Sequence, residues 1–139
     1  MKRPLFVDTN YLCAFYNKSD SLHEKAKKSS SSLGEFHIVI SNFILLESYT
    51  VLSQRVSKNH VLTFKEDMYN EKYYRIYWVD KNLEENIWLI FKSIKDKNFS
   101  YVDAGILAVM KKEKINHLLS FDATFKNLQE QFKFKLIGS

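Results

Sequence analysis

The sequence has few of the residues that cross-link a chain or interrupt its regular structure. Its 139 residues include one cysteine, one proline and three glycines. Because Cys13 is alone, it can form neither an internal disulfide nor a thiolate zinc site, and such usage is typical of a reducing cytoplasm. The shortage of glycine and proline leaves no obvious flexible linker, so we expect residues 1–139 to form a single domain.

Neither a long hydrophobic run nor a strong excess of one charge is present. Residues 1–7 briefly resemble the start of a signal peptide, but Asp8 and Asn10 interrupt the apolar run too early. No stretch approaches the roughly 20 apolar residues that span a bilayer, so we expect a soluble, cytoplasmic protein with no membrane partner. The net charge of +5 is compatible with a nucleic-acid partner, but general solubility explains it equally well.

Short apolar or β-branched runs alternate along the chain with longer segments of helical periodicity. Strands are predicted at about 5–7, 36–40, 73–79, 117–119 and 132–137. Helices are predicted at about 9–16, 21–32, 42–55, 59–70, 81–97 and 100–114. Strands that alternate with helices predict an α/β fold in which helices cover a mainly parallel sheet.

Five acidic residues differ from the other acids because apolar residues flank them. They are Asp8, Glu47, Asp80, Asp103 and Asp122. A buried carboxylate is costly unless it is paired, hydrogen-bonded or bound to a metal, so each of these positions needs a reason. The other acids lie in polar surroundings, which is typical of solvated helix faces.

Two of the five follow predicted strands. Asp8 lies at the carboxyl end of the first strand, where ligands bind in open α/β sheets, and Asp122 follows the strand at 117–119. Either residue could instead cap the helix or turn that comes after it. Capping is also our interpretation of Asp80, because nothing else in the sequence points to it.

Glu47 and Asp103 lie within predicted helices. Glu47 shares a helix face with Ile44 and Val51, and Asp103 shares one with Ile106. Both faces are apolar and are expected to point inward. These positions have no evident capping role, although Asp103 could favour the positive end of its helix.

If Asp8, Glu47, Asp103 and Asp122 meet, they predict a metal site. Two carboxylates 4 Å apart repel by roughly 4 kcal/mol at an effective dielectric constant of about 20, and a divalent cation offsets that repulsion. Ligand sets made only of oxygen suit Mg²⁺ and Mn²⁺. The four histidines form no ligand-spaced pair, and we interpret them as structural or surface residues.

Four segments in order resemble the motifs of the PIN-domain nucleases. They are FVDTN at 6–10, ILLES at 44–48, FSYVDA at 99–104 and LLSFDATF at 118–125. In size the chain is most similar to the VapC-type toxins of toxin–antitoxin pairs, and the resemblance is thinnest over 59–77. It implies a PIN-like three-layer α/β/α sandwich around a mainly parallel sheet of about five strands.

The resemblance also implies metal-dependent hydrolysis of RNA. In this interpretation Asp8, Glu47, Asp103 and Asp122 hold one or two Mg²⁺ or Mn²⁺ ions, with Asp8 and Asp103 as direct ligands. Glu47 would ligate the metal or orient water, and Asp122 would complete the cage. Supporting hydrogen bonds to these carboxylates are expected from two further residues, Asn10 and Ser120.

The implied partners are an RNA substrate, a second copy of the chain and a small antitoxin that covers the site. Six basic residues are candidates to guide the RNA backbone: Lys18, Arg55, Lys58, Lys111, Lys112 and Lys126. The aromatic residues Tyr11, Phe15 and Tyr16 could stack on bases, or could belong to the core or to a dimer contact.

Three alternatives remain open at the level of sequence. A PIN-type RNA-processing nuclease would share the chemistry without being a toxin. A non-catalytic RNA-binding module would bind RNA without needing a divalent metal. An aspartate-nucleophile phosphatase would usually carry a second aspartate where Asn10 stands.

Overall fold

The computed structural model describes residues 2–138 and contains one five-stranded sheet. The strand order is β3-β2-β1-β4-β5, and every neighbouring pair is parallel. The strands are β1 (Arg3–Val7), β2 (Phe36–Ser41), β3 (Tyr74–Tyr77), β4 (His117–Leu119) and β5 (Lys135–Ile137). The expected parallel sheet of about five strands is therefore confirmed.

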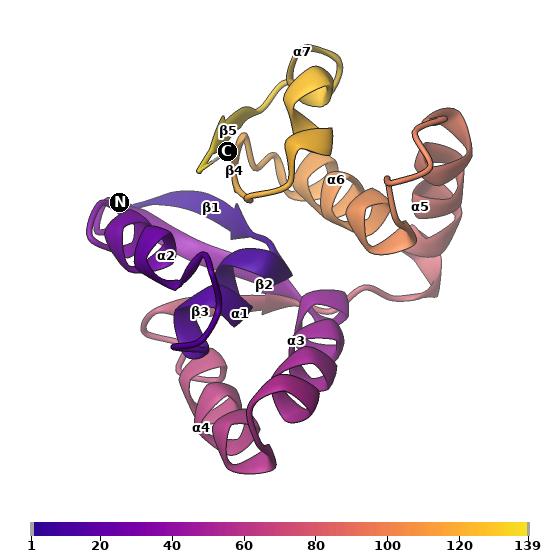
Figure 1. The fold of residues 1–139 in the computed structure, drawn as a ribbon. Helices are drawn as coiled ribbons and strands as arrows, with labels where there is room; N and C mark the ends of the chain where they lie inside the picture. Colours follow the sequence, from indigo (N-terminus) through magenta and orange to yellow (C-terminus); the bar gives the residue numbers. More distant parts are fainter. Residues whose placement is uncertain (1, 139) are drawn as a thin grey trace.

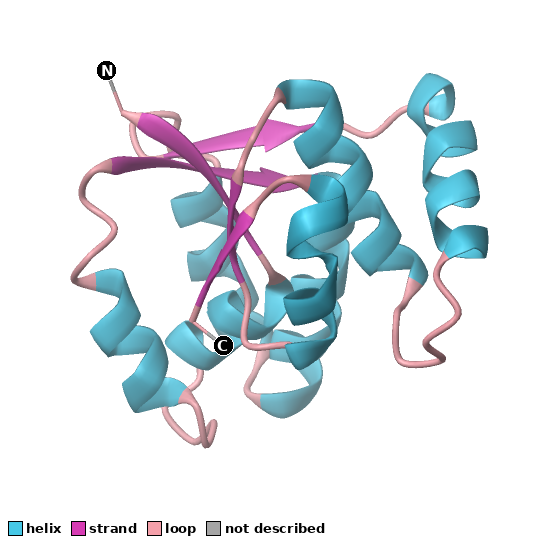
Figure 2. Ribbon diagram, turned by 90° about the horizontal axis from the view of Figure 1, so that it is seen from above, coloured by secondary structure: helices cyan, strands magenta, loops and turns pink. Residues whose placement is uncertain are grey.

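Helices cover both faces of this sheet, as Figure 2 shows. The helices are α1 (Thr9–Tyr16), α2 (His23–Ser30), α3 (Asn42–Arg55), α4 (Lys58–Met68), α5 (Lys81–Ser93), α6 (Tyr101–Glu113), the 3₁₀ helix η1 (Ala123–Leu128) and α7 (Gln129–Phe132). Across residues 2–138, no helix combines the length and apolar character that crossing a membrane requires.

The two helical layers follow from the direction in which the chain winds. From β1 to β3 the chain moves towards one edge of the sheet, and after β3 it returns to build the other edge with β4 and β5. Because parallel crossovers are right-handed, reversing direction moves the connecting helices to the opposite face. Helices α1 to α4 accordingly pack together on one side, and α5 and α6 pack against each other on the other side (Figure 1).

The core is built around β1, which lies at the centre of the sheet. Leu5, Phe6 and Val7 are fully buried because helices cover β1 on both faces. This double burial explains why β1 reads as a continuous apolar run rather than an alternating one. The strand therefore fixes the position of the residue that follows it, Asp8.

The largest errors in the predicted boundaries lie in the second half of the chain. Helix α5 ends at Ser93 rather than near residue 97, since Ile94 is extended and the Asp96 side chain accepts a hydrogen bond from the Asn98 backbone in a turn. Phe132 does not begin a strand but ends α7, where Lys133 adopts a left-handed conformation. The last strand is consequently short and begins at Lys135.

Candidate active site

Asp8 and Asp122 lie at one edge of the sheet because the strands before them are neighbours. Strands β1 and β4 pair in parallel, and the Asp8 backbone N–H donates to the Leu119 carbonyl at 2.9 Å. The chain leaves β1 into α1 on one face and leaves β4 into η1 on the other. A crevice therefore opens between the two carboxyl ends, as at the binding sites of other open α/β sheets.

The Asp8 side chain is held by a buried network. One carboxylate oxygen accepts from the Thr9 backbone at 2.7 Å, and the other accepts from the Ser120 hydroxyl at 2.7 Å. That hydroxyl also accepts from the Asp122 backbone N–H at 3.0 Å and from the Asn10 side-chain amide at 3.4 Å. Ser120 thus positions Asp8 directly, and Asn10 acts through Ser120.

Asp103 lies at the start of α6 and does have a capping role, contrary to the sequence argument. Its carboxylate accepts from the Ser100 backbone at 2.9 Å, while the Ser100 hydroxyl accepts from the Asp103 backbone at 3.0 Å. This reciprocal pair is a capping box. The box orients the carboxylate of a residue that is only 7% exposed, so capping and a second role are compatible.

Glu47 reaches the same region because α3 and α6 approach each other closely. A Cβ atom added to Gly105 of α6 would lie 2.7 Å from a ring carbon of Phe43 on α3. Glycine at this position therefore makes room for the contact. Since Glu47 follows Phe43 by one helical turn, the contact brings its half-buried side chain towards the start of α6.

All four predicted acids line one open cavity of about 560 Å³. The other side chains that line it are mostly polar and include Asn10, Asp20, Arg55, Asn98 and Ser100. Within residues 2–138, however, no three histidine, cysteine or acidic side chains converge closely enough to hold one ion directly. The structure gathers the four acids around a shared cavity without forming a closed cage.

Burial, and to a smaller extent mutual repulsion, raises the pKa of the two most buried carboxylates, those of Asp8 and Asp103. Burial raises the pKa of Asp8 to about 7, the Ser120 hydrogen bond opposes this rise, and the charge of Asp103 adds to it. Burial also raises the pKa of Asp103 to about 6, where the nearby charges of Asp122 and Glu47 contribute. A cation in the cavity would offset each of these unfavourable charges, so the oxygen-rich set fits a divalent ion.

Cys13 and Asp20 also line the cavity. Burial raises the pKa of the Cys13 thiol to about 11, so it stays protonated at neutral pH and is a poor ligand or nucleophile. Asp20 was not predicted, because its polar sequence neighbours are typical of a solvated loop. Its side chain accepts from the Leu22 backbone at 2.8 Å in the turn before α2.

Asp80 lies outside this cavity, and its capping role is confirmed. Its carboxylate accepts hydrogen bonds from the backbone N–H groups of Asn82 and Leu83 at the start of α5. The structure thus separates Asp80 from the four acids that share the cavity, although all five have similar apolar neighbours in the sequence.

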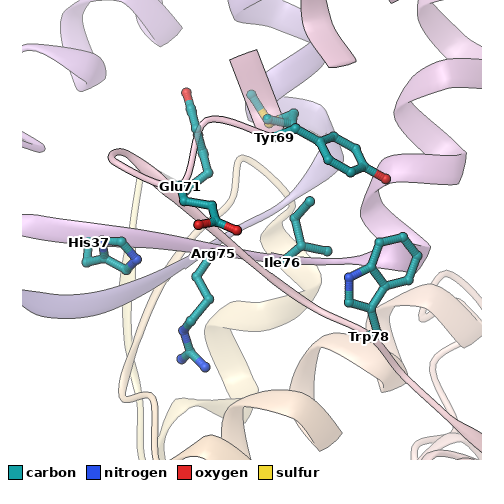
Figure 3. Close-up of a pocket in the computed structure, with 8 residues that line it drawn as sticks. His37, Tyr69, Glu71, Arg75, Ile76 and Trp78 are labelled. Atoms are coloured by element: carbon teal, nitrogen blue, oxygen red, sulfur yellow. The ribbon is translucent and has the colours of Figure 1, made fainter. Parts of the chain in front are cut away.

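A different hollow, of about 380 Å³, lies beside the edge strand β3. Figure 3 shows it with His37, Tyr69, Glu71, Arg75, Ile76 and Trp78 around it. Glu71 is the one acid that lines it. Its single carboxylate makes this hollow a poor candidate for a divalent-metal site.

Comparison with known proteins shows which family and which solved structures this chain is similar to. The family model described as "PIN domain" matches residues 5–131. The chain is 30% identical over 121 residues to the "23S rRNA-specific endonuclease VapC20" of Mycobacterium tuberculosis, which covers 87% of this chain and 91% of that protein.

Solved structures agree with this match. The crystal structure of the M. tuberculosis VapC20, described as a "Sarcin-Ricin loop cleaving toxin", superposes with a TM-score of 0.80 at 29% identity and covers 88% of this chain and 93% of that one. A "toxin-antitoxin complex" from Klebsiella pneumoniae superposes with a TM-score of 0.65 at 15% identity and covers 89% of each chain. The second similarity supports the fold alone.

Proposed function

The chain belongs to the PIN domain family, and we propose from this premise that it is a metal-dependent endoribonuclease and the toxin of a toxin–antitoxin pair. One observation carries the proposal. Acids from four separate segments line one cavity, and two of them, Asp8 and Asp103, have raised pKa values there. Gathering these acids destabilises the folded state unless a cation offsets their charge, which favours a role in binding a cation.

Asp8 and Asp103 are the proposed direct ligands of Mg²⁺ or Mn²⁺, because each is buried and held by hydrogen bonds on the cavity side of the sheet. Glu47 and Asp122 are half-buried and would complete the set directly or through water. When bound, the ion would lower the pKa of a water molecule and offset charge on the phosphate oxygens.

The protein's own groups would then have distinct tasks. Ser120 keeps Asp8 oriented by donating to it, and the capping box keeps Asp103 oriented. Glu47 has the longest side chain of the four acids, so it is suited to accept a hydrogen bond from the attacking water. These roles require the acids to be ionised, and bound metal would favour that form.

RNA is the proposed substrate, and the relative's name gives the first RNA to test. The VapC20 relative is described as specific for 23S rRNA, and the similarity extends over most of both chains. We therefore propose that this chain acts in the cytoplasm on a structured ribosomal RNA.

A small antitoxin is the proposed inhibitor, in line with the toxin descriptions of similar structures.

We also propose a homodimer that forms through the aromatic strip, defined as Phe43, Trp88, Phe91 and Tyr101. Its rings lie 5.5–6.5 Å apart between centroids across α3, α5 and α6, and Trp88 is 50% exposed. The other three rings are half-buried, and aromatic side chains that reach the surface in this way are enriched at protein interfaces. If Trp88→Glu sediments as a dimer like the wild type, this interface is wrong.

The test of the catalytic proposal is cleavage of 23S rRNA by purified protein. We expect products with Mg²⁺ or Mn²⁺, none with chelator, and a loss of at least about 100-fold in Asp8→Asn or Asp103→Asn with folding retained. Asp80→Asn is the matched control, since this acid caps a helix outside the cavity. Equal cleavage by the wild type and both cavity variants would show that these acids are not the active site.

A further inference from the structure

One wall of the acidic cavity is a single face of α3. Glu47, Val51 and Arg55 all line the cavity, and their spacing of four residues places them on the same side of the helix. Eight residues of α-helix rise about 12 Å, so Arg55 lies well along the wall from Glu47. The cavity thus has an acidic end and, further along α3, a basic position.

Arg55 is the only basic residue that lines this cavity in the described part of the chain. Its guanidinium forms no ion pair, because the two salt bridges among residues 2–138 join Arg3 to Glu35 and Arg75 to Glu113. Of the six basic residues that the sequence suggested for RNA contacts, the other five do not line the cavity. Two of those, Lys111 and Lys112, line a separate hollow beside α5.

The position of Arg55 also has a purely structural explanation, which an experiment must distinguish from a role in binding. The residue lies in the last turn of α3, where the helix dipole favours a positive charge. That explanation requires only the charge and is satisfied equally by lysine. It does not require the side chain to line the cavity that holds the four acids.

We propose that Arg55 is a positioning residue that binds a backbone phosphate of the RNA next to the phosphate that is cleaved. The inference rests on the proposed ribonuclease function and adds the path of the RNA strand along α3. An unpaired guanidinium at a cavity wall offers a planar fork of donors that matches phosphate oxygens. Because Arg55 is well separated from Glu47 along the helix, it serves a neighbouring phosphate rather than the reacting one.

The test compares wild type, Arg55→Ala, Arg55→Lys and a control, Lys65→Ala. Lys65 is an exposed cation in the last turn of α4, so its removal changes the net charge equally without touching the cavity. We expect Arg55→Ala to raise KM for RNA about tenfold with kcat nearly unchanged, and Lys65→Ala to change KM less than about twofold. Arg55→Lys should fall between, because it keeps the charge but loses the fork.

RNA binding in the Asp8→Asn background gives a second readout that a helix-dipole role would not move. The slope of log Kd against log salt concentration should decrease by about 1 for Arg55→Ala and stay unchanged for Lys65→Ala. Unchanged KM and salt slope in Arg55→Ala, or a loss confined to kcat, would overturn the assignment. Absence of metal-dependent cleavage by the wild type would instead refute the ribonuclease proposal itself.

Discussion

Replacing Asp8 with asparagine should stabilise the metal-free protein while removing its activity. The carboxyl is buried beside other acids, and its pKa rises from 3.8 to about 7 in the folded state. Since a tenfold change in acidity corresponds to about 1.4 kcal/mol, an ionised Asp8 costs the native state about 4 kcal/mol at pH 8. Asparagine removes this charge and keeps an oxygen that can accept from the Thr9 backbone.

Asparagine does not recover all of this free energy. Its amide N–H₂ group would face Ser120, so the hydrogen bond that the Ser120 hydroxyl donates to the carboxylate at 2.7 Å is lost. We expect a net gain of about 2 kcal/mol at pH 8 with chelator present. A chain of this length gains roughly 4 °C in Tm per kcal/mol, so the melting temperature of Asp8→Asn should exceed that of wild type by about 8 °C.

The direction of the pH dependence follows from the raised pKa. Between pH 3.8 and about 7, Asp8 is mostly protonated in the folded protein but mostly ionised in the unfolded chain. The wild type therefore loses stability as the pH rises through that window. Asp103, with a pKa of about 6, acts in the same direction in both proteins. The stability of Asp8→Asn relative to wild type should therefore change by about 4 kcal/mol between pH 4 and pH 8, from a deficit of about 2 kcal/mol at pH 4 to the gain of about 2 kcal/mol at pH 8.

Thermal denaturation followed by circular dichroism at pH 4, 6 and 8 measures this difference. Adding Mn²⁺ at pH 8 should raise the Tm of wild type but leave that of Asp8→Asn nearly unchanged, because only the carboxylate binds the ion tightly. The reasoning fails if Asp8→Asn is no more stable than wild type in chelator at pH 8, or if its advantage is the same at pH 4.

Three further substitutions test parts of the framework. Ser120→Ala should cost about 1–3 kcal/mol by chemical denaturation and weaken Mn²⁺ binding about 10–100-fold by calorimetry, since Asp8 loses its buried donor; unchanged Mn²⁺ affinity would contradict this role. Gly105→Ala should lower stability by about 1 kcal/mol despite the better helix propensity of alanine, because the added Cβ would clash with the Phe43 ring. A rise in Tm would show instead that the ring moves freely. Asp80→Ala should cost about 1 kcal/mol by the loss of a helix cap and leave RNA cleavage intact; a lost activity would place Asp80 in the site.

The sequence could predict the elements whose pattern has a single physical explanation. The apolar run before Asp8 predicted a buried strand, and strands separated by helical segments predicted a mainly parallel sheet. The region from Ala123 to Phe132 was harder, because short 3₁₀ and α-helical turns depend on local hydrogen bonds that leave no periodicity.

The candidate site could be predicted only in part. The four acids were identifiable from their apolar neighbours and from motif order, but pairwise geometry is a tertiary property. Sequence reasoning assigned Asp103 no capping role, although the helix was predicted to begin near Ser100 and Asp103 lies three residues later, at the spacing of a capping box. It also could not select Arg55 among six candidate cations, since only the packing of α3 beside the cavity distinguishes that residue.

Crystals of the protein soaked with Mn²⁺ give the most direct measurement of the central claim, because the anomalous signal of manganese locates the ion without assumptions about activity. The account predicts a peak in the cavity between Asp8 and Asp103, with Glu47 and Asp122 as the next nearest acids. Mn²⁺ bound elsewhere, or no peak in this cavity at a concentration that supports RNA cleavage, would contradict it.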